Sequence, residues 1–285
     1  MKHMTLQRIA EVCRGIYYGP EELLEKEISS VTTDSRQVES GALFVPIVGV
    51  HVDGHSFIDQ VMEKGALATL SERELGSQPY PYIRVMSCLR AVRYIAEAYL
   101  KELAIPVVGV TGSVGKTSTK EVIAAVLARK FRVLKTKGNH NNELGLPLTV
   151  FSLREEDEIA VLEMGISNFG EMTHLARIAR PDVGVITNIG WCHLENLISR
   201  EGVFRAKTEL LDWIKPGGRI VLNGDDDMLC RVEQCQDMAP VFFGLQPDFP
   251  VWADHVEGMG LKGIRCRIHA GGQEREVAIP LPGQH

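Results

Sequence analysis

The sequence feature that most constrains the fold is a regular alternation of short apolar runs with helical segments between residues 105 and 236. The apolar runs have the length and Val/Ile/Leu content of buried strands, and apolar residues at three- and four-residue steps follow them, as in helices. The predicted strands cover residues 105–110, 159–162, 183–187 and 219–222, and the predicted helices cover residues 116–130, 170–179, 203–214 and 227–236. Strands that alternate with helices in this way predict an α/β fold with a mainly parallel sheet covered on both faces.

The two ends of the sequence have a different texture. After residues 241–243, short apolar runs with glycine turns at 251–256, 263–269 and 274–279 predict an antiparallel addition to the same domain. Before residue 86, a predicted strand at 43–48 and a predicted helix at 57–62 alternate with turn signals, which is typical of a small mixed α/β domain. A chain of 285 residues matches about two domains. We place them at residues 1–85 and 86–285, with an amphipathic helix at 86–103 as the connector.

Composition excludes several classes of partner. Lys and Arg number 31 against 37 Asp and Glu, so the net charge of −6 provides no general basic field for nucleic acid. No apolar run reaches the roughly 18 residues of a membrane span, and Arg8 and Glu11 interrupt the place where a secretory signal needs an apolar stretch. The six cysteines include no CxxC pair. We therefore expect a cytoplasmic, monomeric protein with reduced thiols.

The strongest local signal for chemistry is TGSVGKTS at residues 111–118, between a predicted strand and a predicted helix. Backbone N–H groups in such a turn converge on a phosphate, Lys116 reaches the β- and γ-phosphates, and the Thr117 hydroxyl binds Mg²⁺. The segment departs from the GxxxxGK[ST] pattern, because Val110 stands where the first glycine falls. Nothing resembles a guanine-reading motif. We predict that ATP and Mg²⁺ bind at Thr111, Gly112, Ser113, Val114, Gly115, Lys116, Thr117 and Ser118.

Three more residues are candidates on weaker grounds. Glu163 ends a predicted strand, at the edge where ligands of open α/β sheets bind, and its carboxylate suits Mg²⁺. His193 lies in the loop after the next strand, where a lone histidine is more often a loop residue than a ligand. Lys207 lies on a predicted helix and would by itself be interpreted as a solvated lysine. The run Asp225–Asp227 is most simply a turn and the start of a helix.

Four segments together resemble the Mur ligases, the amide-forming enzymes of peptidoglycan precursor synthesis. TGSVGKTS at 111–118 is similar to the ATP loop of that family, in which the internal glycine is expected. GNHNNELGLP at 138–147 resembles the signature of the member that adds D-alanyl-D-alanine. TDSRQVESGALF at 33–44 and DGHSF at 53–57 are similar to the domain that grips the UDP part of the substrate. The resemblance extends over nearly the whole chain.

The resemblance implies an ATP-dependent ligase that joins D-alanyl-D-alanine to UDP-N-acetylmuramoyl-tripeptide through an acyl phosphate. Residues 1–85 would bind the UDP-substrate and residues 86–285 would bind ATP. Besides Lys116, the implied catalytic residues are Glu163 as a Mg²⁺ ligand, His193 near a second Mg²⁺, and Lys207, which would take up CO₂ as a carbamate and so become a Mg²⁺ ligand. The candidate substrate residues are Ser35 and Arg36 at the nucleotide-sugar end, and Asn139, Asn141, Asn142 and Glu143 at the reacting end.

Three alternatives stay open from the sequence. The chain is the related ligase that adds the third residue, a phosphate-loop kinase or ATPase without a peptide substrate, or a fragment that binds without catalysis. The last follows from the C-terminus, because Mur ligases continue through a Pro-Gly-x-His-Asn motif into a third domain, whereas this chain ends at Pro282-Gly283-Gln284-His285. We expect the 285 residues to lack that domain, to bind the UDP-substrate, and to ligate poorly or not at all.

Overall fold

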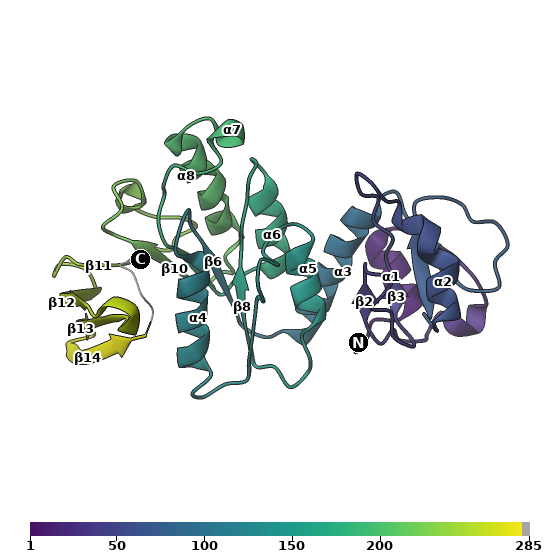
Figure 1. The fold of residues 1–285 in the computed structure, drawn as a ribbon, viewed down its shortest axis with the longest axis horizontal. Helices are drawn as coiled ribbons and strands as arrows, with labels where there is room; N and C mark the ends of the chain where they lie inside the picture. The colour runs from purple at the N-terminus through teal and green to yellow at the C-terminus, as the bar shows by residue number, and fades with distance from the viewer. Residues whose placement is uncertain (281–285) are drawn as a thin grey trace. The chain divides into compact units, whose positions relative to one another are not determined.

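The computed structural model describes residues 1–280, which form two compact units (Figure 1). The first unit consists of Met1–Ala104 and Glu143–Glu155, and the second consists of Ile105–Asn142 and the chain from Glu156 onward. Each unit has a sheet of its own. The segment Pro282–His285, which the sequence analysis singled out, lies outside the described residues.

Five short strands form the sheet of the first unit, in the order β1-β5-β4-β3-β2. The elements are β1 (Ile16–Tyr18), β2 (Val31–Thr32), β3 (Leu43–Phe44), β4 (Ala68–Ser71) and β5 (Tyr82–Arg84), with α1 (Leu6–Cys13), α2 (Ile58–Glu63) and the 3₁₀ turns η1 (Glu21–Leu23) and η2 (Gly54–Phe57). Only β1 and β5 pair antiparallel. The strand predicted over residues 43–48 ends at Phe44, shortly before Pro46, which has no N–H to donate to a ladder. Phe44, Ile58, Val61 and Ala66 form a buried core.

The helix α3 (Cys88–Leu103) belongs to the first unit. It packs against α1 and against α5 (Gly145–Phe151), a helix that the sequence analysis did not predict. The buried Tyr99 hydroxyl of α3 donates a hydrogen bond of 2.8 Å to the carbonyl of Leu153, just after α5. The division between the units therefore falls after Ala104 rather than at the predicted residue 86, and residues 143–155 return to the first unit.

Nine strands form the sheet of the second unit, in the order β14-β13-β12-β11-β10-β9-β6-β8-β7. They are β6 (Val107–Thr111), β7 (Val133–Lys135), β8 (Ile159–Glu163), β9 (Val183–Ile186), β10 (Arg219–Asn223), β11 (Val241–Gly244), β12 (Val251–Gly258), β13 (Ile264–Ala270) and β14 (Gln273–Ile279). The strands from β7 to β12 pair in parallel, while β13 and β14 are antiparallel. The predicted α/β class, a mainly parallel sheet with an antiparallel addition, is confirmed.

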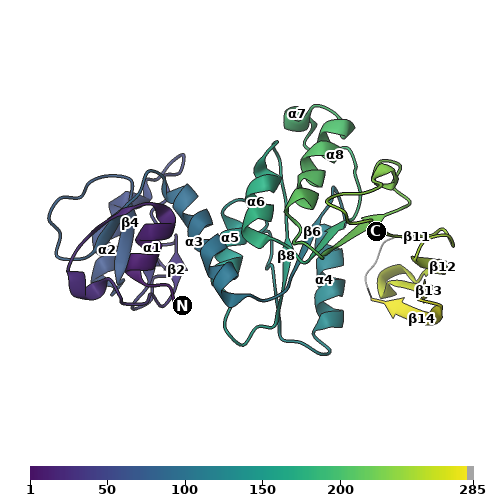
Figure 2. The same cartoon turned by 180° about the vertical axis from the view of Figure 1, so that it is seen from behind.

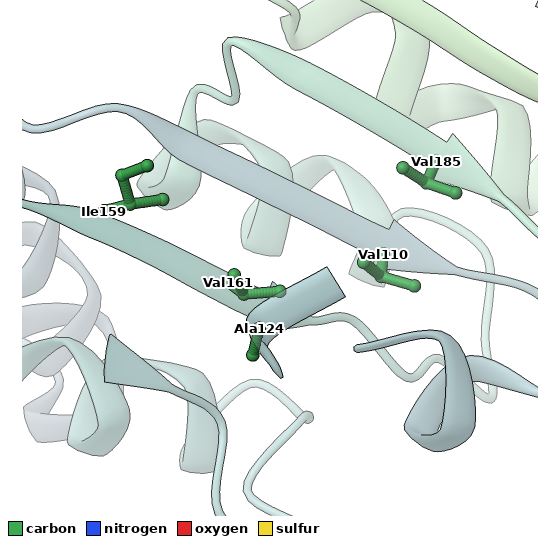
Figure 3. Close-up of a cluster of buried hydrophobic side chains, with 5 residues drawn as sticks. All are labelled: Val110, Ala124, Ile159, Val161 and Val185. Atoms are coloured by element: carbon green, nitrogen blue, oxygen red, sulfur yellow. The ribbon is translucent and has the colours of Figure 1, made fainter. Parts of the chain in front are cut away.

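Helical segments cover both faces of this sheet (Figure 2). The helix α4 (Lys116–Leu127) packs Ala124 against a cluster of strand residues, shown in Figure 3: Val110, Ile159, Val161 and Val185. Successive residues of a strand point to opposite faces. Gly184, beside Val185, accordingly faces Leu210 and Ile214, where an added Cβ would lie 2.7 Å from Ile214 Cδ1. The other helical elements of the unit are α6 (Glu171–Ala179), α7 (Leu194–Leu197), α8 (Arg200–Thr208), η3 (Glu209–Trp213), η4 (Leu229–Arg231) and η5 (Gly260–Lys262).

Two helix predictions were wrong in part. The helix predicted over residues 227–236 is only the turn η4, because the Asp226 carboxylate accepts the N–H groups of Met228 and Leu229, each at 3.0 Å, and this local bonding competes with a helix. The helix predicted over residues 203–214 is α8 followed by η3. Within residues 1–280, no helix combines the length and apolar character that a membrane crossing requires.

Candidate functional site

Three loops meet at the carboxyl edge of the central strands of the second unit. The segment 111–118 follows β6, Glu163 is the last residue of β8, and the loop at residues 187–193 follows β9. Since β8, β6 and β9 are parallel neighbours, their carboxyl ends lie at one edge, where open α/β sheets bind ligands. The fold therefore gathers the candidates that the sequence placed far apart.

The loop at residues 111–118 turns on two glycines. Gly112 has φ +150°, and an added Cβ would lie 1.9 Å from Thr187 Oγ1, so no other residue fits without moving the loop. Gly115 has φ +78° and caps α4. The first N–H groups of a helix have no partner within it, and its positive dipole end attracts anions. These groups thus form a binding place for phosphate at the start of α4.

The loop after β9 fixes the phosphate loop from the other side. The N–H groups of Ser113 and Val114 donate to Asn188 at its backbone oxygen and Oδ1, both over 3.0 Å. The Gly190 N–H donates to Ser113 Oγ over 2.8 Å. Lys116 Nζ donates to the Gly112 carbonyl over 2.8 Å, so its ammonium lies at the mouth of the loop.

Glu163 and Thr117 form the part of this edge that suits a metal ion. The Thr117 hydroxyl lies 3.0 and 3.1 Å from the two carboxylate oxygens of Glu163, and Asn141 Nδ2 donates to Oε1 over 2.9 Å. The Glu163 side chain is 2% exposed. Within the described residues no three His, Cys, Asp or Glu side chains gather as a metal cage. One carboxylate and one hydroxyl beside a phosphate loop fit Mg²⁺, which completes its octahedron with phosphate oxygens and water.

Lys120 is a residue of this edge that the sequence analysis missed. It lies on α4 one turn after Lys116, is 1% exposed, and donates from Nζ to the Thr136 carbonyl over 2.8 Å. Its Nζ also lies 3.6 Å from Glu163 Oε2 and 3.1 Å from Glu121 Oε1. The four-residue spacing from Lys116 was the available signal, since it places both side chains on one face of the helix.

Lys207 and His193 differ in their surroundings. Lys207 is 1% exposed on α8, where burial lowers the pKa of its amine to about 8, Lys116 lowers it further, and Cys192 opposes the change. The interpretation of Lys207 as a solvated lysine was wrong. His193 precedes α7 as an exposed residue with φ +52°, and no hydrogen bond or ion pair within residues 1–280 joins it to Glu163 or Thr117.

The residues of the 138–147 motif separate between the two units. Asn141 reaches Glu163 in the second unit, as described above. Asn139 and Asn142 are exposed. Glu143 belongs to the first unit, where it forms an ion pair of 2.9 Å with Arg93. The structure therefore joins only Asn141 of this group to the phosphate-loop residues by a described contact.

Ser35 and Arg36 line a cavity of about 690 Å³ in the first unit. Thr33, Phe44, Ile47 and Phe57 are also part of its wall. Hydrogen bonds from the side chain and the backbone of Arg36 lower the pKa of Asp34 to about 2. The cavity thus combines an apolar floor with a charged rim, an arrangement suited to a ring with polar substituents.

Family models account for nearly the whole chain. A model described as the Mur ligase middle domain matches residues 110–285, and one described as Mur ligase family, catalytic domain, matches residues 27–111. The chain belongs to the Mur ligase family. The resemblance found in the sequence is confirmed, and this Mur ligase carries its phosphate loop at the point where the two matches meet.

Relatives of this Mur ligase include the UDP-N-acetylmuramoyl-tripeptide–D-alanyl-D-alanine ligase of Bacillus subtilis, which is 45% identical over 234 residues. That match covers 81% of this chain and 51% of the relative. A crystal structure of MurF from Acinetobacter baumannii aligns with a TM-score of 0.89 at 30% identity, over 98% of this chain and 61% of that one. MurF from Thermotoga maritima in complex with ADP aligns at 0.79 and 33% identity, over 87% of this chain and 57% of that one. The Mur ligase chain thus spans about half the length of the curated relatives it matches.

Proposed function

We propose that the protein is an ATP-dependent ligase that joins D-alanyl-D-alanine to UDP-N-acetylmuramoyl-tripeptide in the cytoplasm, and that its 285 residues bind ATP and the UDP-substrate. The observation that carries the proposal is the pairing of Thr117 with Glu163 at 3.0 Å, beside a phosphate loop. It occurs in a Mur ligase whose Bacillus subtilis relative bears the name of this activity at 45% identity.

In this proposal the phosphate loop holds ATP through three kinds of contact. The N–H groups at the start of α4 bind phosphate oxygens, and Lys116 turns from the Gly112 carbonyl toward the β- and γ-phosphates. Thr117 and Glu163 hold Mg²⁺, with Asn141 fixing the Glu163 carboxylate. Bound Mg²⁺ neutralises charge on the phosphate oxygens, which favours phosphoryl transfer.

The reaction then needs positioning more than covalent chemistry by the protein. A carboxylate oxygen of the tripeptide attacks the γ-phosphorus, the bond from that phosphorus to the ADP oxygen breaks, and an acyl phosphate and ADP form. The free amine of D-alanyl-D-alanine attacks the acyl carbon, loses a proton, and expels inorganic phosphate to leave an amide. Lys116 balances negative charge that moves between the phosphate oxygens during the first step.

Lys207 is proposed to carry CO₂ as a carbamate. An amine attacks CO₂ only in its neutral form, and burial of Lys207 with a pKa of about 8 favours that form near neutral pH. The nitrogen forms a bond to carbon and loses a proton, so a cation becomes an anion suited to Mg²⁺. His193 is proposed to act near the same ion after the 190–193 loop adjusts, since His193 is exposed in this structure.

The first unit is proposed to grip the UDP end of the substrate. Ser35 and Arg36 line its cavity, and the Ser35 carbonyl accepts a 2.8 Å hydrogen bond from Lys64, which anchors that turn. Arg36 is exposed, so its guanidinium has donors available to a diphosphate. Asn139, Asn142 and Glu143 are proposed to contact the reacting end.

An acceptor panel tests the proposed function. Phosphate release is measured with ATP, Mg²⁺ and UDP-N-acetylmuramoyl-tripeptide, using the whole protein in which these 285 residues occur. We expect release that depends on D-alanyl-D-alanine and produces the amide by mass spectrometry. ADP formation that ignores the acceptor would instead indicate a kinase or an ATPase, and preference for diaminopimelate or lysine would indicate the ligase that adds the third residue.

A further inference from the structure

Lys120 is a buried charge that the proposed mechanism does not use. Its side chain is 1% exposed, and the Glu163 side chain beside it is 2% exposed. Burying an ammonium is costly unless it is paired and hydrogen-bonded. Lys120 meets both conditions through the Thr136 carbonyl at 2.8 Å and the carboxylates of Glu121 and Glu163.

Thr136 connects Lys120 to Glu163 a second time. Its carbonyl accepts from Lys120 Nζ, while its hydroxyl accepts from the Glu163 N–H over 2.9 Å. The lysine and the carboxylate are thus held by one residue, on the β7 side of β8. Lys120 is fixed there and serves Glu163 rather than any group in solvent.

We propose that Lys120 is a positioning residue that cancels the charge of Glu163, so that the divalent cation binds only together with the nucleotide. The carboxylate by itself would attract a bare cation in a site of low dielectric. An ammonium 3.6 Å from Glu163 Oε2 opposes that attraction. The phosphates of ATP or ADP supply the missing negative charge, which makes metal binding conditional on nucleotide.

Lys135 provides a matched control for this idea. It is a second lysine of the same network, and it forms an ion pair with Glu121 but no described contact with Glu163. It is 42% exposed at the side chain, so its removal leaves no buried charge unpaired. Lys120→Met and Lys135→Met therefore remove the same charge at different distances from the carboxylate.

The test measures Mn²⁺ binding by electron paramagnetic resonance, with the metal alone and with ADP, on the 285-residue chain. Wild type is expected to bind Mn²⁺ alone at least tenfold more weakly than in the presence of ADP. Lys120→Met is expected to tighten binding of Mn²⁺ alone at least tenfold, Lys120→Arg to stay within twofold of wild type, and Lys135→Met to do the same. The tightening should vanish in Lys120→Met combined with Glu163→Gln.

A folded Lys120→Met that binds Mn²⁺ alone no better than wild type overturns the proposal, and so does equal tightening in Lys135→Met or tightening that survives Glu163→Gln. If circular dichroism shows Lys120→Met to be unfolded, wild type decides: equal affinity for Mn²⁺ with and without ADP refutes the idea. The inference rests on the proposed function for its metal site. Unchanged Mn²⁺ binding in Glu163→Gln with ADP present would instead show that the proposed site itself is wrong.

Discussion

The buried amine of Lys207 makes the stability of the fold depend on pH in a predictable direction. Its pKa falls from 10.5 to about 8 in the folded protein, chiefly through burial. The unfolded chain thus binds the proton more tightly, and stability rises with pH. The stabilising contribution is fully present above pH 10.5 and is lost as the pH falls through about 8. At neutral pH the protonated amine costs about 3 kcal/mol relative to its neutral form.

Replacement of Lys207 by Met removes this cost and keeps an unbranched side chain of similar length. We expect Lys207→Met to be more stable than wild type at pH 7 and its advantage to shrink by about 1 kcal/mol at pH 9, as linkage requires. Urea unfolding in CO₂-free buffer at the two pH values measures the difference. Lys262→Met, which removes an exposed lysine, is the control. An advantage that stays constant or grows from pH 7 to pH 9 would refute the reasoning.

Three further outcomes follow from the second unit. Gly112→Ala should weaken ADP binding at least tenfold in calorimetry, because its Cβ would lie 1.9 Å from Thr187 Oγ1, whereas Gly138→Ala, with open space around it, should bind normally; equal effects would contradict this. Asp226→Asn should lower the free energy of unfolding by about 2 kcal/mol in urea, since the carboxylate accepts three backbone N–H groups; a change within 0.5 kcal/mol, roughly the scatter of surface substitutions, would argue against it. ¹³C-bicarbonate should give a carbamate carbon signal in nuclear magnetic resonance of wild type, and its persistence in Lys207→Met would exclude this lysine.

The parallel sheet was predictable because its strands carry a strong local signal. Buried parallel strands such as Val107–Thr111 and Ile159–Glu163 are apolar along their whole length, and a phosphate loop is a contiguous pattern. The helix at 227–236 failed because one side chain, Asp226, closes the backbone into a turn. That competition depends on a tertiary partner, the Ile189 N–H, which no local pattern includes.

The site residues divide along the same line. Lys116 and Thr117 were found from adjacent letters, while Lys120 and Lys207 read as ordinary helix lysines until the fold buried them. The return of residues 143–155 to the first unit was equally hidden, since α5 is a short apolar helix whose packing partner, α3, lies over 40 residues earlier. Long-range burial, which decides the chemistry of a charged side chain, is a property of the assembled fold.

The central claim, that the loop at residues 111–118 binds the nucleotide phosphates, has a direct test. Isothermal titration of Mg·ADP into the 285-residue chain should show one site, and Lys116→Met should weaken it at least tenfold. Lys130→Met, which removes an exposed lysine after the end of α4, should leave the affinity within twofold of wild type. No binding by wild type, or equal binding by wild type and Lys116→Met, would contradict the account.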